Sequence, residues 1–355
     1  MVSEKTLDQK VTEACHRIEE LYYETDGKCY ISYSGGKDST VLLALVKLCE
    51  EVYTIPENDI PAVFVNTGIE MGVTTDFVKW VKGNYYPNLI TIRPSVSFDW
   101  VLKTHGKPLK SKLRSEYLGR WQNGRRTRSV IQNMIEGKTN SGKDAWKLKL
   151  YDRDLHMIHD NFPIHASKKC CDYLKKKPFA DYARIAGMKG QATGIREGEG
   201  GARALNINDR LQKNARICTS VDKKGFVKKA PIIDWTDEDA DGFIARYKVP
   251  LSRAYTEYGF HRTGCMACPY AQDVDENLRY LHDHEPNRYK AAMHWLKDVY
   301  IAQNVILPFD EEYENERIKT WFEVYEPMRQ EMLRKYRPNS KLIKTEEQIN
   351  IFDLL

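Results

Sequence analysis

The run from residue 29 to 46 constrains the fold more than any other part of the sequence. It holds a short segment rich in β-forming residues that stops at Ser34, then Gly35 and Gly36, then an amphipathic segment. This order predicts a strand, a tight turn and a helix. Glycines let the backbone approach a ligand closely, and a helix N-terminus beside Lys37 is suited to an anion such as phosphate or sulfate.

The glycine turn is not a Walker A loop, which needs G-x-x-x-x-G-K-[ST]. Ile31 stands where that motif has its first glycine, and Asp38 follows the lysine. Asp38, Ser39 and Thr40 are expected to cap the start of the helix. An ordinary glycine turn without a ligand is the alternative, and the uninterrupted S-G-G-K-D-S motif argues against it.

The bulk properties of the chain exclude several classes of protein. Its 355 residues can form one large or two small domains, and the net charge of +5 is too small to indicate a partner. No apolar run reaches the roughly 18 residues of a membrane span, and the start of the chain is too charged for a signal peptide. We therefore expect a cytoplasmic protein without membrane association. Its eight cysteines then indicate thiols or metal ligands rather than disulfides.

Alternating strand and helix patterns predict a parallel sheet. A helix is expected over residues 1–27, a buried strand from Ala62 that ends in a loop, a helix near 72–84 and a strand over Leu89–Ile92. Ligands of such sheets bind beyond the carboxyl ends of the strands. Ser34 after the first strand and Asn66, Thr67 and Gly68 after the second should therefore line one pocket.

Residues 103–149 form a basic insertion. Between Lys103 and Arg128, nine Lys or Arg side chains stand against one acid, with Tyr117 and Trp121 interleaved. Cations interleaved with aromatic residues suit a phosphate backbone with stacked bases, so DNA or tRNA is a candidate partner. The alternative is a solvated helical insertion whose charges face water.

Four of the cysteines form a pattern typical of a metal site. Cys170 and Cys171 are adjacent, and Cys265 and Cys268 form a C-x-x-C motif, which together suffice for one four-cysteine site. Adjacent residues rarely bind one tetrahedral ion without strain, but they can reach two irons of a cubane. The pattern therefore favours a 4Fe–4S cluster over zinc, and unconnected thiols are the remaining alternative.

The S-G-G-K-D-S motif resembles the PP-loop of the ATP pyrophosphatases (adenine nucleotide α-hydrolases) and of their relatives, the sulfonucleotide reductases. The stretch 66–70 is similar to the adenosine-contacting D-T-G-x-x-F-P-E-T segment of that family, with Asn for Asp and without F-P. The stretches 170–178 and 264–268 resemble the cluster-binding segments of the adenylylsulfate reductase branch. The resemblance implies that these cysteines hold a 4Fe–4S cluster.

Two further stretches match the same family. Gly194, Arg196 and Arg203 fit its G-x-R-x-x-x-x-x-x-R region, where both arginines meet phosphate or sulfate. Residues 230–239 resemble P-[IL]-x-D-W-T-x-x-[DE], and we expect a mainly architectural role: a buried strand end, then a helix capped by Thr236. The matches tie residues 28–270 to the family at five places.

The resemblance implies an adenine nucleotide α-hydrolase-like, Rossmann-like α/β fold, a parallel sheet flanked by helices. The expected parts are the N-terminal helix (1–27), the PP-loop core (28–102), the basic insertion (103–160), the rest of the core with the cysteines (161–272) and a helical C-terminal region with a tail (273–355). Nucleotide binding is expected of Ser34, Gly35, Gly36, Lys37, Asp38, Ser39, Asn66, Thr67, Gly68, Gly194, Arg196 and Arg203. Lys37, Asp38 and Arg196 are the expected catalytic residues, and Asp38 also helps to hold Mg²⁺.

The resemblance leads to three functional hypotheses. The favoured one is an enzyme that adenylates a substrate with ATP and Mg²⁺, releasing pyrophosphate, for iron–sulfur-dependent sulfur transfer as in DNA phosphorothioation and tRNA thiolation, with sulfide or a protein as sulfur donor. The second is a sulfonucleotide reductase, which needs a thiolate on a mobile C-terminal tail, whereas no cysteine follows Cys268. The third is a non-catalytic nucleotide- and cluster-binding protein.

The remaining segments give weaker signals. His156, His159 and His165 have metal-like spacing but are expected at the surface of a basic loop. Helices are expected over 281–303 and 311–336. The tail segment 348–352 resembles the Q-x-x-[LI]-F peptide with which DNA-processing proteins bind the bacterial sliding clamp, and a docked apolar tail is the alternative.

Overall fold

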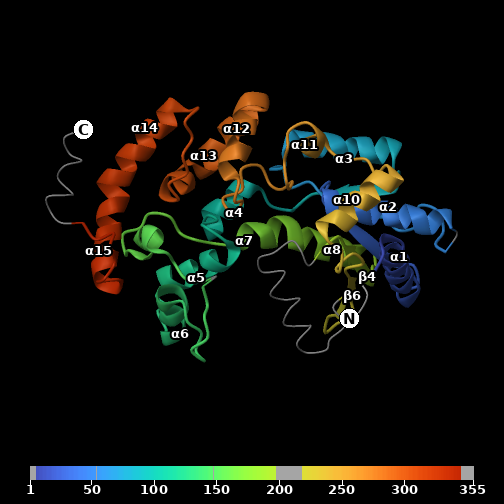
Figure 1. Cartoon of the computed structure of the whole chain (residues 1–355), viewed down its shortest axis with the longest axis horizontal. Helices are drawn as coiled ribbons and strands as arrows, with labels where there is room; N and C mark the ends of the chain where they lie inside the picture. The colour runs from blue at the N-terminus through green and yellow to red at the C-terminus, as the bar shows by residue number, and fades with distance from the viewer. Residues whose placement is uncertain (1–4, 53, 147, 197–217, 345–355) are drawn as a thin grey trace. The chain divides into compact units, whose positions relative to one another are not determined.

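A computed structural model describes residues 5–52, 54–146, 148–196 and 218–344 (Figure 1). The chain forms two compact units, each built from two separate stretches. The first unit comprises residues 1–95 and 174–264, and the second comprises residues 96–173 and 265–355. None of the helices in the described ranges is long and apolar enough to cross a membrane.

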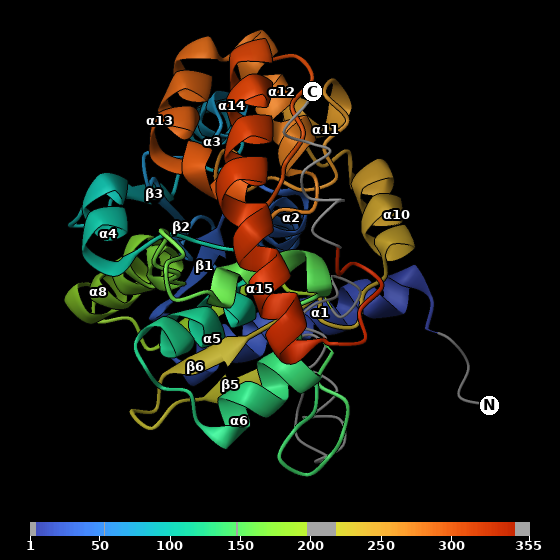
Figure 2. The same ribbon diagram turned by 90° about the vertical axis from the view of Figure 1, so that its left-hand side faces the viewer.

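The first unit is built on a six-stranded sheet with the order β3-β2-β1-β4-β6-β5. All neighbours are parallel except β5 and β6, which are antiparallel. The strands are β1 (Cys29–Tyr33), β2 (Ala62–Val65), β3 (Leu89–Ile92), β4 (Gly190–Thr193), β5 (Thr219–Val221) and β6 (Val227–Lys229); several of them are visible in Figure 2. The predicted Rossmann-like parallel sheet flanked by helices is confirmed.

Helices cover both faces of this sheet. They are α1 (Leu7–Glu24), α2 (Lys37–Glu51), α3 (Gly72–Asn84), α8 (Lys177–Ile185), α10 (Asp237–Tyr247) and α11 (Arg253–Thr256). Ile31 and Tyr33 of β1 point into the main core with side chains of α1, α2, α3 and α10, whereas Tyr30 packs against α8 on the opposite face. Alternate residues of the strand thus serve two hydrophobic layers.

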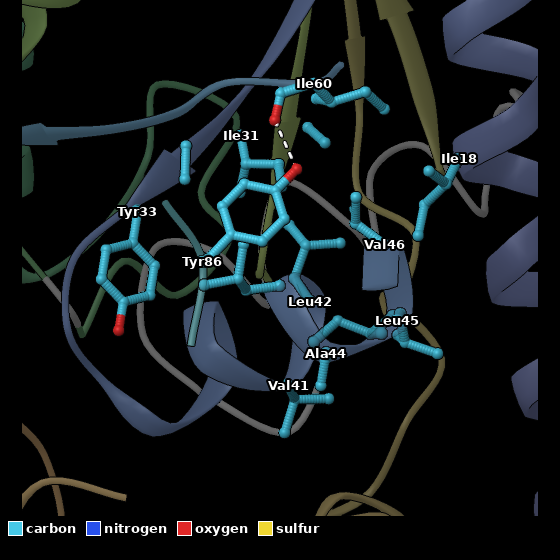
Figure 3. Packing of buried hydrophobic residues seen from close by; sticks show 14 of the residues in the cluster. Ile18, Ile31, Tyr33, Val41, Leu42, Ala44, Leu45, Val46, Ile60 and Tyr86 are labelled. Carbon is cyan, nitrogen blue, oxygen red and sulfur yellow. Dashed lines mark hydrogen bonds between the residues drawn. The ribbon is translucent and has the colours of Figure 1, made fainter. Parts of the chain in front are cut away.

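The main core is built mostly from aliphatic and aromatic side chains (Figure 3). Leu42, Leu45 and Val46 of α2 are fully buried there, and each such side chain contributes about 1.5–3 kcal/mol to folding. The Tyr86 hydroxyl donates a hydrogen bond of 2.7 Å to the carbonyl of Ile60. This packing fixes α2, and with it the loop that precedes α2.

The start of α2 differs from the prediction. Gly36 is the N-cap and no side chain caps the helix, so the expected capping by residues 38–40 is wrong. The Ser39 and Thr40 hydroxyls instead donate to the Gly36 carbonyl, each at 2.9 Å. The first N–H groups of the helix are therefore not taken up by a side-chain cap of its own.

The second unit is helical in its described residues. Its helices are α4 (Phe98–His105), α5 (Lys112–Gln122), α6 (Arg128–Ile131), α7 (Lys169–Cys171), α12 (Val274–His284), α13 (Pro286–Ala302), α14 (Glu311–Thr320) and α15 (Glu326–Tyr336). The helix expected over 281–303 is two helices, because Pro286 starts α13 and cannot continue α12. The helix expected over 311–336 is present as α14 and α15 joined by a π-helical turn, Trp321–Tyr325.

His156 contradicts the expectation of a surface histidine. It lies in the 3-10 helix Asp152–Ile158 and is fully buried. Its ring packs against Trp321 and Tyr325, with centroids 5.0 and 5.2 Å away. Burial lowers its pKa to about 4, although the charge of Asp154 partly opposes the shift. His156 is therefore a neutral core residue.

We expect acid to destabilise the protein through His156. Its pKa is about 6.5 in the unfolded chain and about 4 in the folded one, so between these values only the unfolded chain takes up the proton. The free energy of unfolding should therefore fall by about 3 kcal/mol as the pH drops from 7 to below 4. Urea unfolding of the wild type and of His156→Phe at a series of pH values measures this contribution, and the same change at the exposed His16 is the control. Equal pH slopes for the wild type and His156→Phe would refute it.

Candidate nucleotide site and cysteine cluster

The phosphate-binding loop predicted from the sequence follows β1 directly. Gly35 has φ +74°, and a Cβ there would lie 3.0 Å from a Val78 methyl group. A Cβ on Gly36 would lie 2.9 Å from the Thr263 hydroxyl. Both positions therefore need glycine, because the loop backbone is closely covered by other parts of the unit.

Two serines close the loop. The Ser34 N–H donates to the Ser39 hydroxyl at 3.2 Å, and the two hydroxyl oxygens are 3.0 Å apart. These bonds tie the end of β1 to the first turn of α2. The loop is consequently held in shape by its own side chains.

Arg196 connects β4 to the loop. Its guanidinium, only 4% exposed, donates to Asp38 and to Asp237, each at 2.7 Å. Its third nitrogen, Nη1, is buried and has no hydrogen-bond partner among the described residues. Burial alone would lower the pKa of Arg196, but the bonds to the two carboxylates raise it, and the same bond lowers the pKa of Asp237. The structure thus brings the predicted pair Asp38 and Arg196 into direct contact.

Gly194 allows this approach. A Cβ at this position would lie 2.7 Å from the carbonyl oxygen of Asp38 and 3.0 Å from the amide nitrogen of Ser39. Because backbone atoms cannot yield as a flexible side chain can, only glycine lets the end of β4 lie against the start of α2.

The acids of α10 are site residues that the sequence analysis missed. The Lys37 ammonium lies 2.9 Å from Asp241 and 3.9 Å from Asp237. Their spacing of four residues places both on one face of the helix. A spacing of four residues predicts a shared helix face, so the sequence carried a usable signal for this pair.

The preceding part of the same segment is structural, in line with the expectation. Asp234 receives two hydrogen bonds from Arg17, at 2.6 and 3.1 Å, and Trp235 is buried. Thr236 forms a capping box with Asp239. The expected strand end is absent, however, because β6 stops at Lys229 and residues 231–234 form a turn.

The loop after β2 lies at the same edge of the sheet. Because β1 and β2 are adjacent and parallel, Asn66 and Ser34 follow neighbouring strand ends, as predicted. Thr67 donates from its N–H and its hydroxyl to the buried carboxylate of Glu70, at 2.9 and 2.6 Å, and the Gly68 N–H donates to Asn66 Oδ1. Arg203, the remaining predicted ligand, lies outside the described residues.

Two tyrosines of the second unit hold the segments that carry the four cysteines. The Tyr270 hydroxyl donates to the carbonyl of Ser167, 3.1 Å away, and so joins the C-x-x-C loop to the segment before α7. The Tyr300 hydroxyl donates at 2.6 Å to the carbonyl of Ala267, a residue inside the C-x-x-C motif with φ +47°. The turn between Cys265 and Cys268 is thus fixed from outside.

The four thiols influence one another. A hydrogen bond with Cys171, burial, and the charges of Cys268 and Cys265 all raise the pKa of Cys170. The two cysteine segments therefore lie near each other within the second unit. Among the described residues, however, no group of three or more His, Cys, Asp or Glu side chains is placed so that it could hold a metal ion. Metal ligation by these thiols stays a prediction.

Comparison with curated proteins finds relatives of low sequence identity. Over 120 residues, 34% of its length, the chain is 29% identical to an adenosine 5'-phosphosulfate reductase of Streptomyces coelicolor, of which the match covers 41%. The chain spans less than half the length of the curated relatives it matches.

Two solved structures are among those to which the chain is similar at low sequence identity. A phosphoadenylyl-sulfate reductase of Candida auris is 13% identical, with a TM-score of 0.41 over 75% of this chain and 96% of that one. A U34-tRNA thiolase of Methanococcus maripaludis, solved with its [4Fe-4S] cluster, is 14% identical, with a TM-score of 0.37 over 83% of this chain and 80% of that one.

The sequence also matches one protein family over most of its length. The match covers residues 28–271, which include the phosphate loop, Arg196 and all four clustered cysteines. The chain therefore belongs to the phosphoadenosine phosphosulfate reductase domain family.

Proposed function

We propose that the protein is an ATP pyrophosphatase that adenylates an acceptor for sulfur transfer. A substrate oxygen attacks the α-phosphorus of ATP, the bond to the β-phosphate breaks, and pyrophosphate leaves. A sulfur nucleophile then displaces AMP from the activated acceptor. Sulfonucleotide reduction is the second candidate, because the curated relatives of this family include adenosine 5'-phosphosulfate reductases.

The observation that carries the proposal is the set of positive groups around the start of α2. The loop amides, Lys37 and Arg196 belong to one unit, and the guanidinium contacts Asp38 in the first turn of α2. Lys37 and Arg196 would neutralise the departing pyrophosphate, and such preorganised charge is a large source of rate. The Nη1 of Arg196, buried without a partner among the described residues, leaves a donor for a phosphate oxygen.

Mg²⁺ would enter with the nucleotide. Asp38 accepts a hydrogen bond of 2.7 Å from Arg196, and Asp237 and Asp241 lie near Lys37. Three carboxylates are therefore present around the start of α2. Because Mg²⁺ is commonly held by one or two carboxylates, phosphate oxygens and waters, these residues fit the ion once ATP is bound. Asp38 would then exchange its contact with Arg196 for the metal.

The four cysteines fit an iron–sulfur cluster better than a single zinc ion. Four thiolates can bind either metal, but the adjacent Cys170 and Cys171 would reach two irons of a cluster more easily than one tetrahedral ion. Cys170, Cys171, Cys265 and Cys268 would hold the cluster, which would bind or relay sulfur. Tyr270 and Tyr300 would keep the two cysteine segments in place through the bonds described above.

Nucleic acid is the acceptor that the basic insertion favours. Five of its nine cations between residues 103 and 128 pair with acids: Lys103, Lys107, Lys110, Arg120 and Arg126. Lys112, Arg114, Arg125 and Arg128 have no acidic partner among the described residues. Trp121 is buried and unavailable for stacking, which corrects the expectation, but Trp146 and Tyr151 are 60% and 41% exposed.

The exposed turn before α6 gives a direct test. We expect Arg125→Ala with Arg128→Ala to weaken binding of tRNA or duplex DNA and to reduce the slope of log K against log salt concentration by about 2, because each arginine would release one phosphate counterion. The control removes the same charge at Lys103 and Lys138, which pair with Asp99 and Asp144. Equal losses of nucleic-acid affinity in both double variants would indicate a non-specific effect of charge. That result would count against a binding surface at Arg125 and Arg128.

The assay for the proposed function compares two substrates. Anaerobically purified protein is incubated with Mg²⁺, a dithiol as electron donor and either ATP or adenylyl sulfate, and AMP, pyrophosphate and sulfite are measured. We expect pyrophosphate and AMP from ATP, increased by the correct acceptor. Sulfite from adenylyl sulfate without ATP turnover would establish the reductase instead. Binding of a sliding clamp through residues 348–352 stays a prediction, because that segment lies outside the described residues.

A further inference from the structure

The hydroxyl of Tyr255 lies at the N-terminal end of α2. Its oxygen accepts a hydrogen bond from the backbone N–H of Lys37 at 3.0 Å. The same oxygen accepts the N–H of Thr263 at 3.2 Å and lies 3.1 Å from the Thr263 hydroxyl. Groups from two distant parts of the chain therefore meet at one oxygen atom.

Such a convergence of donors is what a phosphate oxygen requires. The Lys37 N–H is at the positive end of the 15-residue helix α2, which has no side-chain cap. A phenol oxygen satisfies this N–H but brings no negative charge, and hydrogen bonds to an anion are about twice as strong. The buried Arg196, which contacts Asp38 in the first turn of α2, adds a second donor here, because its Nη1 has no hydrogen-bond partner among the described residues.

We propose that Tyr255 is a gate whose hydroxyl holds the place of a phosphate oxygen. This inference rests on the proposed function: when pyrophosphate, or the terminal phosphates of ATP, enter the loop, a phosphate oxygen replaces the phenol as acceptor. Thr263 then becomes a phosphate ligand through its N–H and hydroxyl. Its hydroxyl already lies against the loop, 2.9 Å from where a Cβ on Gly36 would be.

The neighbouring chain permits the exchange. Tyr255 lies in the four-residue helix α11, and Gly259, shortly after it, has φ +68° with no atom within 4 Å of a Cβ built there. The Tyr255 side chain is only partly buried, so its phenol can leave the loop by side-chain rotation while the fully buried Ala254 keeps α11 in place. The hydroxyl thus competes with the ligand, and its removal should strengthen ligand binding.

The test measures affinity and stability together. For Tyr255→Phe we expect the Kd for Mg²⁺-pyrophosphate, from calorimetric titration, to fall about three- to tenfold, the size of one hydrogen bond. The melting temperature without ligand should fall at the same time, because the phenol bonds are lost. Thr263→Val should raise the Kd by a similar factor. Tyr258→Phe is the control, since this hydroxyl accepts from Arg253 and not from the loop.

The directions in which Kd and melting temperature change in Tyr255→Phe decide the outcome. A merely structural tyrosine would lower both stability and affinity, so a raised or unchanged Kd in Tyr255→Phe would overturn the gate while pyrophosphate binding by the wild type still supports the proposed function. Absence of pyrophosphate and ATP binding in the wild type would overturn the proposed function and the gate with it.

Discussion

Lys37→Ala is expected to lower kcat/KM for pyrophosphate release from ATP about 100- to 1,000-fold, the usual loss when one preorganised donor to a developing charge is removed. Lys37 lies at the first position of α2 with its ammonium 2.9 Å from Asp241. Since the Asp241 side chain is 62% exposed, loss of this pair should cost less than about 1 kcal/mol of folding stability. The activity loss would therefore be chemical rather than structural.

Two further lysine variants sharpen this test. Lys37→Arg keeps the charge but changes its shape, so we expect partial activity. Lys79→Ala removes an exposed lysine of α3 that pairs with the exposed Asp76, and its activity should equal that of the wild type. Turnover by Lys37→Ala at the wild-type rate would remove this side chain from the mechanism.

Cys265→Ser is expected to abolish binding of the proposed iron–sulfur cluster. Anaerobically prepared wild-type protein should contain iron and acid-labile sulfide in equal amounts and absorb visible light, and the variant should lose both, because a serine oxygen is a poor ligand for iron in place of a thiolate. Elemental analysis and the visible spectrum measure this directly, without any activity assay.

Cys218 offers the matched control for this experiment. It lies outside the group of four, and its sulfur lies 3.6 Å from the hydroxyl of Thr219. Cys218→Ser should keep the full iron content. Zinc in place of iron in the wild type would show that the site binds the less favoured metal. Equal iron contents in Cys265→Ser and Cys218→Ser would exclude Cys265 as a ligand.

The phosphate loop could be predicted because its determinants are local. A β-forming run, two glycines and an amphipathic segment decide the strand, the turn and the helix within a few residues. The parallel order of β1, β2 and β3 followed from the alternation of strands and helices. That the four cysteines form one site stays a prediction from their spacing, and the bond from Tyr270 to the segment before α7 is consistent with it.

Other residues of the site could not be predicted in the same way. Asp241 and Tyr255 reach the loop from 204 and 218 residues away, and no local pattern encodes such a contact. Acids near the start of α10 are already explained by the helix dipole. Their contact with Lys37 therefore cannot be inferred from the local sequence. The prediction for His156 was wrong because the segment is basic overall, whereas the residues beside His156 are apolar. Those residues, Leu155, Met157 and Ile158, are all buried.

The π-helical turn Trp321–Tyr325 sets the rotational phase of the helix that follows it. A π turn holds one residue more than an α turn, and α15 contacts the 3-10 helix Asp152–Ile158 extensively. Deleting a single residue here would restore a regular helix but would turn every later side chain by about 100°. Met332 and Leu333, both buried, would then face solvent. Homologues should therefore vary in length outside this turn and not within it.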